Sequence, residues 1–291
     1  MKFADNCLAY YYTPKAYLIQ CFNGAMTLKG NANYGSIFMV NFMIFKTQTT
    51  DKIKAIFDGT KDTLVWSCLD GTMGEIYTDE EEKSASAVIG DFCFLAGEPC
   101  RELIENAICD YVIMVPQDEK WSELIVENFG EKARKFTRYA TKKELTFDIK
   151  SLECAKLPDG FEMKFIDNKI FDYCKNTYWC SDFVSQYKDF ETYEELGLGV
   201  AVLKDDVLVS GASSYSAYKG GIEIQVDTKS GYRRQGLAYF ACAKLILKCL
   251  EKGIFPSWDA HNLTSLALAQ KLGYQFSHSY TAYEIKRNTD A

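Results

Sequence analysis

The residues best suited to chemistry form an octapeptide in the C-terminal half, Gly231-Tyr232-Arg233-Arg234-Gln235-Gly236-Leu237-Ala238. It lies between a predicted strand at 222–226 and a predicted helix at 237–252. Two small residues, Gly236 and Ala238, flank the start of that helix, so the backbone can turn tightly and direct several unpaired N–H groups outward. Amides in this geometry bind anions, phosphate groups above all.

The charge around this loop supports an anion site. Between residues 228 and 253 there are six Lys or Arg residues and one Glu, in a chain of net charge −7. Amides, the helix dipole and basic side chains would hold a pyrophosphate together. The alternative is a surface turn that leads into a helix with a basic face. The loop is neither a P-loop nor a full G-x-G-x-x-G dinucleotide fingerprint, which argues against a flavin or nicotinamide enzyme.

A second segment, residues 258–274, carries a matching pattern after one helix and one strand. At this point the chain resembles the GNAT acetyltransferase superfamily, whose R/Q-x-x-G-x-G/A motif opens a helix and is matched by Arg233, Gly236 and Ala238. The family's later helix, N-x-x-[SA]-x-x-[LF]-x-x-K-x-G-[FY], is matched at Asn262, Ser265, Leu268, Lys271, Gly273 and Tyr274. Two motifs in this order are much more specific than either one alone.

The resemblance implies acetyl-CoA as co-substrate and assigns its binding residues. The pyrophosphate clamp would be the amides of residues 233–238, that is Arg233, Arg234, Gln235, Gly236, Leu237 and Ala238. A splay after the family's fourth strand would place Gln225, Val226, Asp227 and Thr228 along the cofactor. Asn262 and Ser265, one helical turn apart, should face the same groove.

Acetyl transfer to an amine also needs a route for the amine proton. We predict that Glu223 or Asp259 provides it, directly or through a water. Glu223 alternates with Ile222 and Ile224, so it points to the opposite side of the strand. Its alternative role is the polar face of a half-buried strand. Asp259 ends a strand, where substrates meet α/β sheets, and its alternative role is an N-cap for the next helix.

One position departs from the family pattern. The family's common general acid is a Tyr four residues before the Gly that ends the later helix, and here that residue is Ala269. The thiolate would then take its proton from His261, Tyr274 or water. A lone His at a helix start is more often an exposed neighbour of the cap.

Eight aromatic residues lie in the region that covers the acceptor site in this family: Phe171, Tyr173, Tyr178, Trp179, Phe183, Tyr187, Phe190 and Tyr193. They could form an acceptor pocket. Their spacing of three and four residues favours a core-facing helix for most of them.

The predicted fold is α/β (α+β), a GNAT fold with a mixed, mostly antiparallel sheet flanked by helices. In the N-terminal half, residues 90–99 and 114–144 resemble the subgroup that includes the zwittermicin A resistance acetyltransferase, without an R-x-x-G-x-A loop. We therefore expect a degenerate GNAT-like lobe at 1–143 and the acetyltransferase domain at 144–291. The tyrosines at 10–12 and the apolar run 37–45 are apolar enough to pack.

The elements expected in the N-terminal half are a strand at 87–95, a short helical segment, a strand at 111–115, a helix at 121–129 and a strand near 136–140. An alternating segment at 145, 147 and 149 follows. The C-terminal half then reads as a strand at 161–166, a helical region at 169–195, strands at 199–204, 207–215 and 222–226, helices at 237–252 and 263–272, and a strand at 256–259 between those helices. We expect these strands, with those at the C-terminal end, to form one mixed sheet.

Composition narrows the class of protein. A net charge of −7 opposes binding to nucleic acid or anionic membranes. The longest apolar run is nine residues, too short to span a membrane, and Pro14 and Lys15 interrupt any signal peptide, so we expect a cytoplasmic protein. Eleven cysteines without a C-x-x-C pair and only two histidines indicate neither a disulfide framework nor a metal site.

The sequence thus favours an N-acetyltransferase that acts on a primary amine of a small molecule, such as an amino-bearing antibiotic or metabolite. A non-catalytic CoA-binding or regulatory protein is the alternative that Ala269 suggests. An aminoacyl-tRNA-dependent transferase would suit two lobes, but the acidic charge opposes it. A strand near the C-terminus, if exposed, could pair across a two-fold axis in a homodimer.

Overall fold

The structure is a computed structural model that describes residues 21–22, 25–26, 43–107, 110–144 and 146–286. The chain forms two compact units, residues 1–41 and 42–291. In the first unit, β1 (Cys21–Phe22) pairs antiparallel with β2 (Ala25–Met26). The tyrosines at 10–12, residues 37–42 and Leu145 lie outside the described residues, so the expectations placed on them are not tested.

The second unit contains an eight-stranded sheet, in the order β14-β8-β15-β7-β6-β5-β4-β3. Six of its strands come from the N-terminal half of the chain, and β14 and β15 come from the C-terminal half. Only the neighbours β6 and β7 are parallel in it. Its strands are β3 (Phe45–Thr47), β4 (Glu75–Thr78), β5 (Ser84–Ile89), β6 (Phe92–Gly97), β7 (Tyr111–Pro116), β8 (Ala133–Thr141), β14 (Asp259–Ala260) and β15 (Phe276–Lys286).

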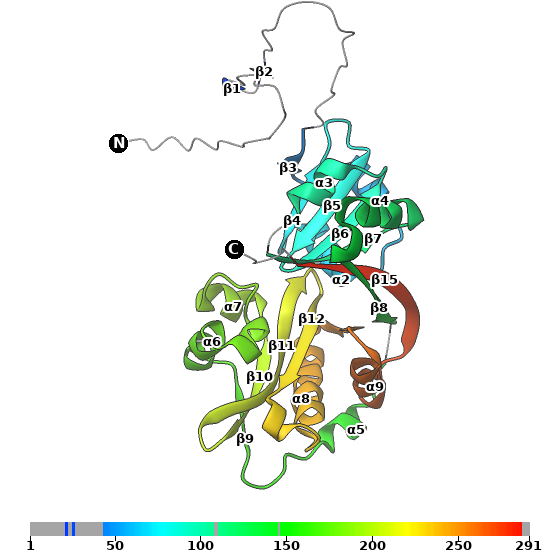
Figure 1. The fold of residues 1–291 in the computed structure, drawn as a ribbon. Coiled ribbons are helices and arrows are strands. Elements are labelled where there is room, and N and C mark those ends of the chain that lie inside the picture. Colours follow the sequence, from blue (N-terminus) through cyan, green and yellow to red (C-terminus); the bar gives the residue numbers. More distant parts are fainter. Residues whose placement is uncertain (1–20, 23–24, 27–42, 108–109, 145, 287–291) are drawn as a thin grey trace, which may run out of the picture. The chain divides into compact units, whose positions relative to one another are not determined.

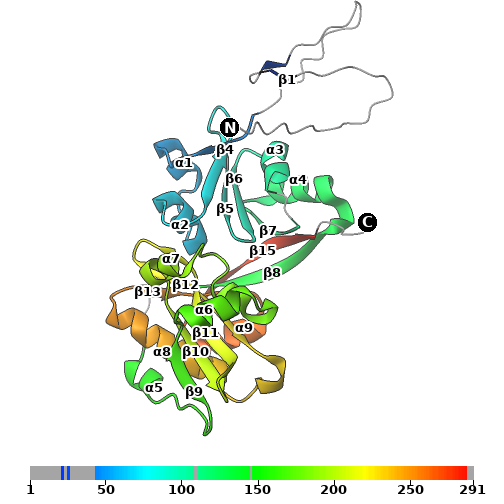
Figure 2. The ribbon, with the colours of Figure 1, turned by 90° about the vertical axis from the view of Figure 1, so that its left-hand side faces the viewer.

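Helices cover both faces of this sheet (Figure 2). One face carries α1 (Asp51–Ile56) and α2 (Thr63–Asp70), and the other carries α3 (Arg101–Asn106) and α4 (Glu119–Phe129), which a short 3₁₀ turn, η1 (Gly130–Lys132), follows. Three of these helices begin at a side chain that accepts a hydrogen bond from a backbone N–H of the first turn, namely Thr50, Asp62 and Asp118. The caps fix where each helix starts relative to the sheet.

A second sheet of five strands has the order β13-β12-β11-β10-β9. Its strands are β9 (Glu162–Phe165), β10 (Gly199–Lys204), β11 (Val207–Tyr218), β12 (Gly221–Thr228) and β13 (Phe255–Ser257). The core on one face includes α5 (Ile149–Glu153), α8 (Leu237–Glu251) and α9 (Leu263–Lys271), as Figure 1 shows for α8. The other face carries α6 (Asn168–Lys175), η2 (Tyr178–Phe183) and α7 (Phe190–Leu196), and η3 (Ser230–Tyr232) precedes α8.

The structure confirms the predicted mixed α/β fold and corrects several elements. The expected strand at 87–95 is a hairpin of β5 and β6, which turns at Gly90, a residue with a φ of +55°. The expected alternation after residue 145 is not a strand, and Ile149 begins α5. Asp205 and Asp206 form the hairpin turn between β10 and β11, both with positive φ as a type I′ turn requires. Cys242 and Cys249 are fully buried on α8.

The C-terminal strands do not join the sheet that we expected. β14 and β15 belong to the eight-stranded sheet, where β15 lies between β8 and β7, so the strands of the C-terminal half do not form one sheet. β15 is paired on both sides only from Tyr283 to Ile285, and from Phe276 to Ala282 it pairs with β8 alone. Pairing of that free edge in a homodimer stays a prediction. The division into 1–143 and 144–291 stays a prediction.

Candidate active site

The candidate site lies where β12 and β13 part. β13 pairs with β12 only from Gly221 to Glu223, and β12 then continues to Thr228 with β11 as its single neighbour. After Trp258 the chain joins the other sheet, because β14 pairs with β8. This is the splay that the resemblance implies, and it leaves one backbone edge of β12 unpaired.

A cavity of about 440 Å³ opens at this point, and we call it the splay cavity. Its lining includes seven of the residues that the sequence selected: Glu223, Gln225, Val226, Asp227, Asp259, Asn262 and Ser265. It also includes polar residues that sequence reasoning missed, among them Asp62, Asp91, Arg138, Asp182, Tyr215 and Tyr280. The structure thus brings strand, helix and loop residues from both halves of the chain around one space of ligand size.

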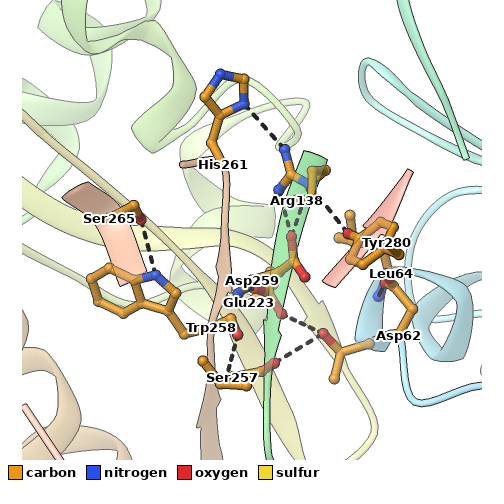
Figure 3. A network of polar contacts seen from close by, with 12 residues as sticks. Asp62, Leu64, Arg138, Glu223, Ser257, Trp258, Asp259, His261, Ser265 and Tyr280 are labelled. Atoms are coloured by element: carbon orange, nitrogen blue, oxygen red, sulfur yellow. Dashed lines mark hydrogen bonds and ion pairs between the residues drawn. The ribbon is translucent and has the colours of Figure 1, made fainter. Parts of the chain in front are cut away.

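Glu223 is buried, and both of its carboxylate oxygens have partners. Ile222 and Ile224 pack into the α8 core, while Glu223 points the other way, toward the cavity. Its Oε1 accepts a hydrogen bond from the backbone N–H of Asp259 at 2.6 Å, and its Oε2 accepts one from the hydroxyl of Thr63. Glu223 therefore ties β12 to β14 and to the start of α2 (Figure 3).

Asp259 forms an ion pair with Arg138, a residue that the sequence did not select. Nε and Nη2 of Arg138 each lie 2.8 Å from Oδ1 of Asp259, and both side chains are almost fully buried. Burial raises the pKa of Asp259 and the positive charge of Arg138 opposes that rise. Asp259 does not cap α9, because Asn262 occupies that position.

Arg138 contacts three further side chains besides Asp259. Its Nε also lies 3.2 Å from the hydroxyl of Tyr280, its Nη1 lies 3.4 Å from Nδ1 of His261, and its guanidinium stacks over the Phe92 ring at 4.8 Å. One signal was available in the sequence: Arg138 shares a strand face with Phe136 and Ala140, so a charge at that position needs a buried partner.

Asp62 is the second carboxylate that the sequence missed. It is the N-cap of α2, and its Oδ1 accepts a hydrogen bond from the backbone N–H of Leu64 at 2.9 Å. Burial raises the pKa of Asp62, the charges of Asp259 and Glu223 raise it as well, and Lys143 opposes them, so that together they bring the pKa to about 7. The sequence signal here, Asp before an apolar helix, indicated only a cap.

Asn262 and Ser265 lie on the cavity wall opposite β12. Oδ1 of Asn262 accepts a hydrogen bond from the backbone N–H of Ser265 at 2.9 Å, which starts α9. The hydroxyl oxygen of Ser265 accepts a hydrogen bond from the indole Nε1 of Trp258 at 3.2 Å. The two side chains therefore face the same groove, as their spacing predicts.

The predicted anion loop lies at the exposed start of α8. Gly236 precedes the helix with a φ of +81°, no side chain caps the helix, and a Cβ at Gly236 would meet open space. The first N–H groups of a 15-residue helix are thus free to bind an anion. Gln235 is exposed and Ala238 is half-buried, whereas the Leu237 side chain is buried and anchors the helix.

The two arginines of the loop differ. Nε of Arg233 donates to the Thr228 carbonyl at 2.9 Å, and its Nη2 lies 3.6 Å from Asp227, so Arg233 holds the loop against the end of β12. Arg234 is exposed and has a φ of +62°. The Thr228 side chain is buried, and its Oγ1 is hydrogen-bonded to Oγ of Ser210 at 2.6 Å. Thr228 therefore offers only its backbone to a ligand.

The residues considered for the general acid lie in different environments. The Tyr274 hydroxyl donates to the Pro256 carbonyl at 2.5 Å in the core, and burial raises its pKa well above the usual value. His261 lines the splay cavity, and burial together with Arg138 lowers its pKa. Ala269 is fully buried in the core.

Of the eight aromatics expected over the acceptor site, Phe171, Phe183, Tyr187 and Tyr193 are buried in the core beneath α6 and α7, which confirms the core interpretation for them. None of the eight lines the splay cavity. In the described ranges no group of three or more His, Cys, Asp and Glu side chains is arranged to hold a metal ion. Within the same ranges no helix is both long and apolar enough to cross a membrane.

Comparison with known proteins agrees with this geometry. The sequence model of the GNAT acetyltransferase family matches residues 54–283. A GCN5-related N-acetyltransferase-like protein from Streptococcus suis 89/1591 is 46% identical, with a TM-score of 0.79, over 81% of this chain and 97% of that one. The uncharacterized N-acetyltransferase YdfB of Bacillus subtilis (strain 168) is 28% identical over 250 residues, 79% of this chain and 94% of its own length. The chain belongs to the GNAT acetyltransferase family, a family of acyltransferases.

Proposed function

We propose that this protein transfers the acetyl group of acetyl-CoA to a primary amine of a small molecule. The observation that carries the proposal is the course of β12 along the splay cavity. At one end of the strand lies the buried carboxylate of Glu223, and at the other end Asp227 and Thr228 contact the loop before the uncapped start of α8. An anion site and a carboxylate site are therefore joined by one unpaired strand edge.

The residues present fit a CoA thioester. The free amides of residues 236–238 and the exposed Arg234 suit the pyrophosphate. The unpaired edge of β12 from Gln225 to Thr228 offers backbone groups to the amides of the pantetheine arm, with Asn262 and Ser265 across the cavity. Bound acetyl-CoA supplies an acetyl group that is already activated as a thioester.

Glu223 and Asp259 belong to the catalytic site in this proposal. Positive charge develops on an amine nitrogen as it attacks a carbonyl carbon, and buried carboxylates nearby stabilise that charge. Arg138 balances Asp259, and Thr63 together with the Asp259 amide fixes Glu223. The splay cavity has more acidic than basic side chains in its lining, which favours a cationic amine over an anionic acceptor.

A non-catalytic CoA-binding protein is the second candidate. Ala269 is buried and has no group to donate a proton, and the Tyr274 hydroxyl is bonded within the core. In this candidate CoA would bind without turnover. In the catalytic proposal, water or His261 protonates the thiolate.

Four finer proposals accompany this function. Residues 1–143 would form a degenerate GNAT-like lobe beside an acetyltransferase domain at 144–291. The chain would belong to the zwittermicin A resistance-type subgroup, and it would act in the cytoplasm. A homodimer would pair through the edge of β15 from Phe276 to Ala282, where β8 is the one paired neighbour.

Calorimetric titration with acetyl-CoA and with CoA tests the function first. Gly236→Glu should abolish binding, because it places a carboxylate where the pyrophosphate would lie. Gly253→Glu is the matched control: Gly253 has a φ of +70° and open space around it, but it follows the other end of α8. Binding that survives Gly236→Glu, or no binding to the wild type, would refute the proposal. Release of free thiol with a panel of amines then separates the enzyme from the non-catalytic candidate.

A further inference from the structure

A second cavity, which the function proposed above leaves unused, lies on the other side of the carboxylates. It measures about 350 Å³, within the range of small-molecule sites, and we call it the α2 cavity. It is formed by the segment between α1 and α2 and by the ends of β6 and β7, all in the N-terminal half. Asp62, Asp259 and Tyr280 line both cavities, so these three side chains form a shared partition between them.

The α2 cavity has apolar and polar walls. Its apolar side chains are Phe57, Val65, Phe94 and Val115, and its polar ones include Asp58, Thr60, Lys61, Gln117 and His278. The partition with its two carboxylates closes one end, where Lys143 also lies. A ligand that fits this distribution has a hydrophobic body and one cationic or polar head group.

Of the carboxylates of Asp62, Asp259 and Glu223, that of Asp62 accepts the fewest hydrogen bonds. Both oxygens of Glu223 accept hydrogen bonds, and Oδ1 of Asp259 accepts two from Arg138. Asp62 caps α2 through Oδ1 alone. It is also placed in the lining of both cavities, so a group that enters from either side can reach it.

We propose that the α2 cavity binds the acetyl acceptor, a primary amine on an apolar chain or ring, and that Asp62 accepts the proton of that amine. The inference rests on the proposed function, since it assumes that the thioester lies in the splay cavity. The ammonium group first loses one proton to water, and the neutral amine nitrogen then bonds to the carbonyl carbon while the C–S bond breaks with its electron pair going to sulfur. The nitrogen loses one proton to Asp62 and the sulfur gains one from water or His261, which yields the amide and the free thiol.

The surroundings of Asp62 agree with a proton acceptor near neutral pH. Asp259 on β14 and Glu223 on β12 face it with negative charge, Lys143 after β8 faces it with positive charge, and Tyr280 on β15 borders it. Burial and the two carboxylates together raise its pKa to about 7. A group of this pKa takes the proton from the positively charged nitrogen that has attacked the carbonyl carbon and returns it to water at pH 7 to 8.

The first test is the variant Asp62→Asn, assayed by thiol release with saturating acetyl-CoA. The acceptors are 2-phenylethylamine and hexylamine as apolar amines, and ethanolamine and glucosamine as polar ones. We expect the apolar amines to have kcat/KM values at least 10-fold higher. For the wild type kcat should rise with pH through about 7, and Asp62→Asn should lose that inflection and about 100-fold or more of kcat.

The matched control for this variant is Asp118→Asn. Asp118 caps α4 as Asp62 caps α2, and it lines neither cavity, so its change should leave kcat within about threefold. An unchanged kcat and inflection in Asp62→Asn would overturn its role as proton acceptor. A preference for polar amines, or no turnover of any amine in the panel by a protein that binds acetyl-CoA, would overturn the acceptor class.

The second test fills the cavity. Val115→Trp should raise the KM for 2-phenylethylamine at least 10-fold and leave the Kd of acetyl-CoA unchanged, because Val115 lines only the α2 cavity. Val126→Trp on the exposed face of α4 controls for the added ring. An unchanged KM in Val115→Trp would overturn the assignment of the cavity. Failure of the wild type to bind acetyl-CoA would instead refute the proposed function, so the two failures are distinct.

Discussion

Arg138 and Asp259 meet at the only point where the β13–β14 segment enters the eight-stranded sheet, with Nε and Nη2 of Arg138 both 2.8 Å from Oδ1 of Asp259. Their strands are neighbours, and Asp259 is paired with Ala140, two residues from Arg138. The pair is nearly inaccessible to water, so each charge depends on the other. It fixes the geometry of the candidate site and joins strands from both halves of the chain.

Removal of one member of this pair should strongly destabilise the fold. Arg138→Leu leaves the Asp259 carboxylate buried without its partner, and we expect a loss of about 3–5 kcal/mol in the free energy of unfolding by urea titration. Arg101→Leu is the exposed counterpart, since Arg101 pairs with Glu127 at the surface, and it should lose at most about 1 kcal/mol. The double variant Arg138→Leu/Asp259→Leu should recover part of the loss. Equal effects at the two arginines would contradict the burial argument.

Tyr274 should be structural. Tyr274→Phe removes the hydrogen bond to the Pro256 carbonyl, and we expect about 1–2 kcal/mol less stability with kcat changed by less than about threefold. Burial raises the pKa of Tyr274, so its hydroxyl keeps the proton throughout the working pH range. The kcat of thiol release and the midpoint of unfolding test whether Tyr274 is structural or catalytic. A fall of kcat by 100-fold or more, with stability retained, would instead identify Tyr274 as the acid.

Asp62 should make the stability of the fold depend on pH. Its pKa is raised from 3.8 to about 7, so the folded state holds the proton more tightly than the unfolded chain. The stabilisation from the protonated form is complete below pH 4 and is lost as the pH rises through 7. Asp62→Asn does not titrate and still caps α2, so its Tm relative to the wild type should rise between pH 4.5 and pH 8. Since Asp62 is partly exposed, we expect about 1 kcal/mol, or about 2–4 °C. A gap that is independent of pH would contradict the raised pKa.

Arg234 should lower the stability of the fold and strengthen the binding of CoA. Its φ of +62° is unfavourable for a residue with a side chain, so Arg234→Gly should stabilise the fold by about 0.5 kcal/mol. The same change removes a charge beside the proposed pyrophosphate site, and the Kd for CoA should rise about 3- to 10-fold. Asp205→Gly relieves a similar φ of +50° in the β10–β11 turn, and it should leave the Kd unchanged. Calorimetry on the three proteins checks both effects, and an unchanged Kd in Arg234→Gly would remove Arg234 from the clamp.

Local pattern was enough to predict part of the site. The spacing of Asn262 and Ser265 places them on one helix face, and the alternation around Glu223 separates it from the apolar side of its strand. Thr63, by contrast, reaches Glu223 across 160 residues of sequence, and Arg138 reaches Asp259 across 121. No local period encodes such encounters. The same reason explains β15, whose strand character was visible and whose neighbours β7 and β8 were not.

The position of β15 has a consequence for how the chain is made. β7 and β8 end at Pro116 and Thr141, yet the strand that lies between them ends at Lys286. During synthesis at about 5–20 residues per second, the central gap of the eight-stranded sheet stays open until the ribosome has passed residue 286. Strands far apart in the sequence must therefore pair to complete this sheet, and long-range pairing of this kind slows folding. A nascent chain that stalls before β15 exposes unpaired edges of β7 and β8. Because unpaired strand edges promote aggregation, the addition of β15 protects the first half of the chain from it.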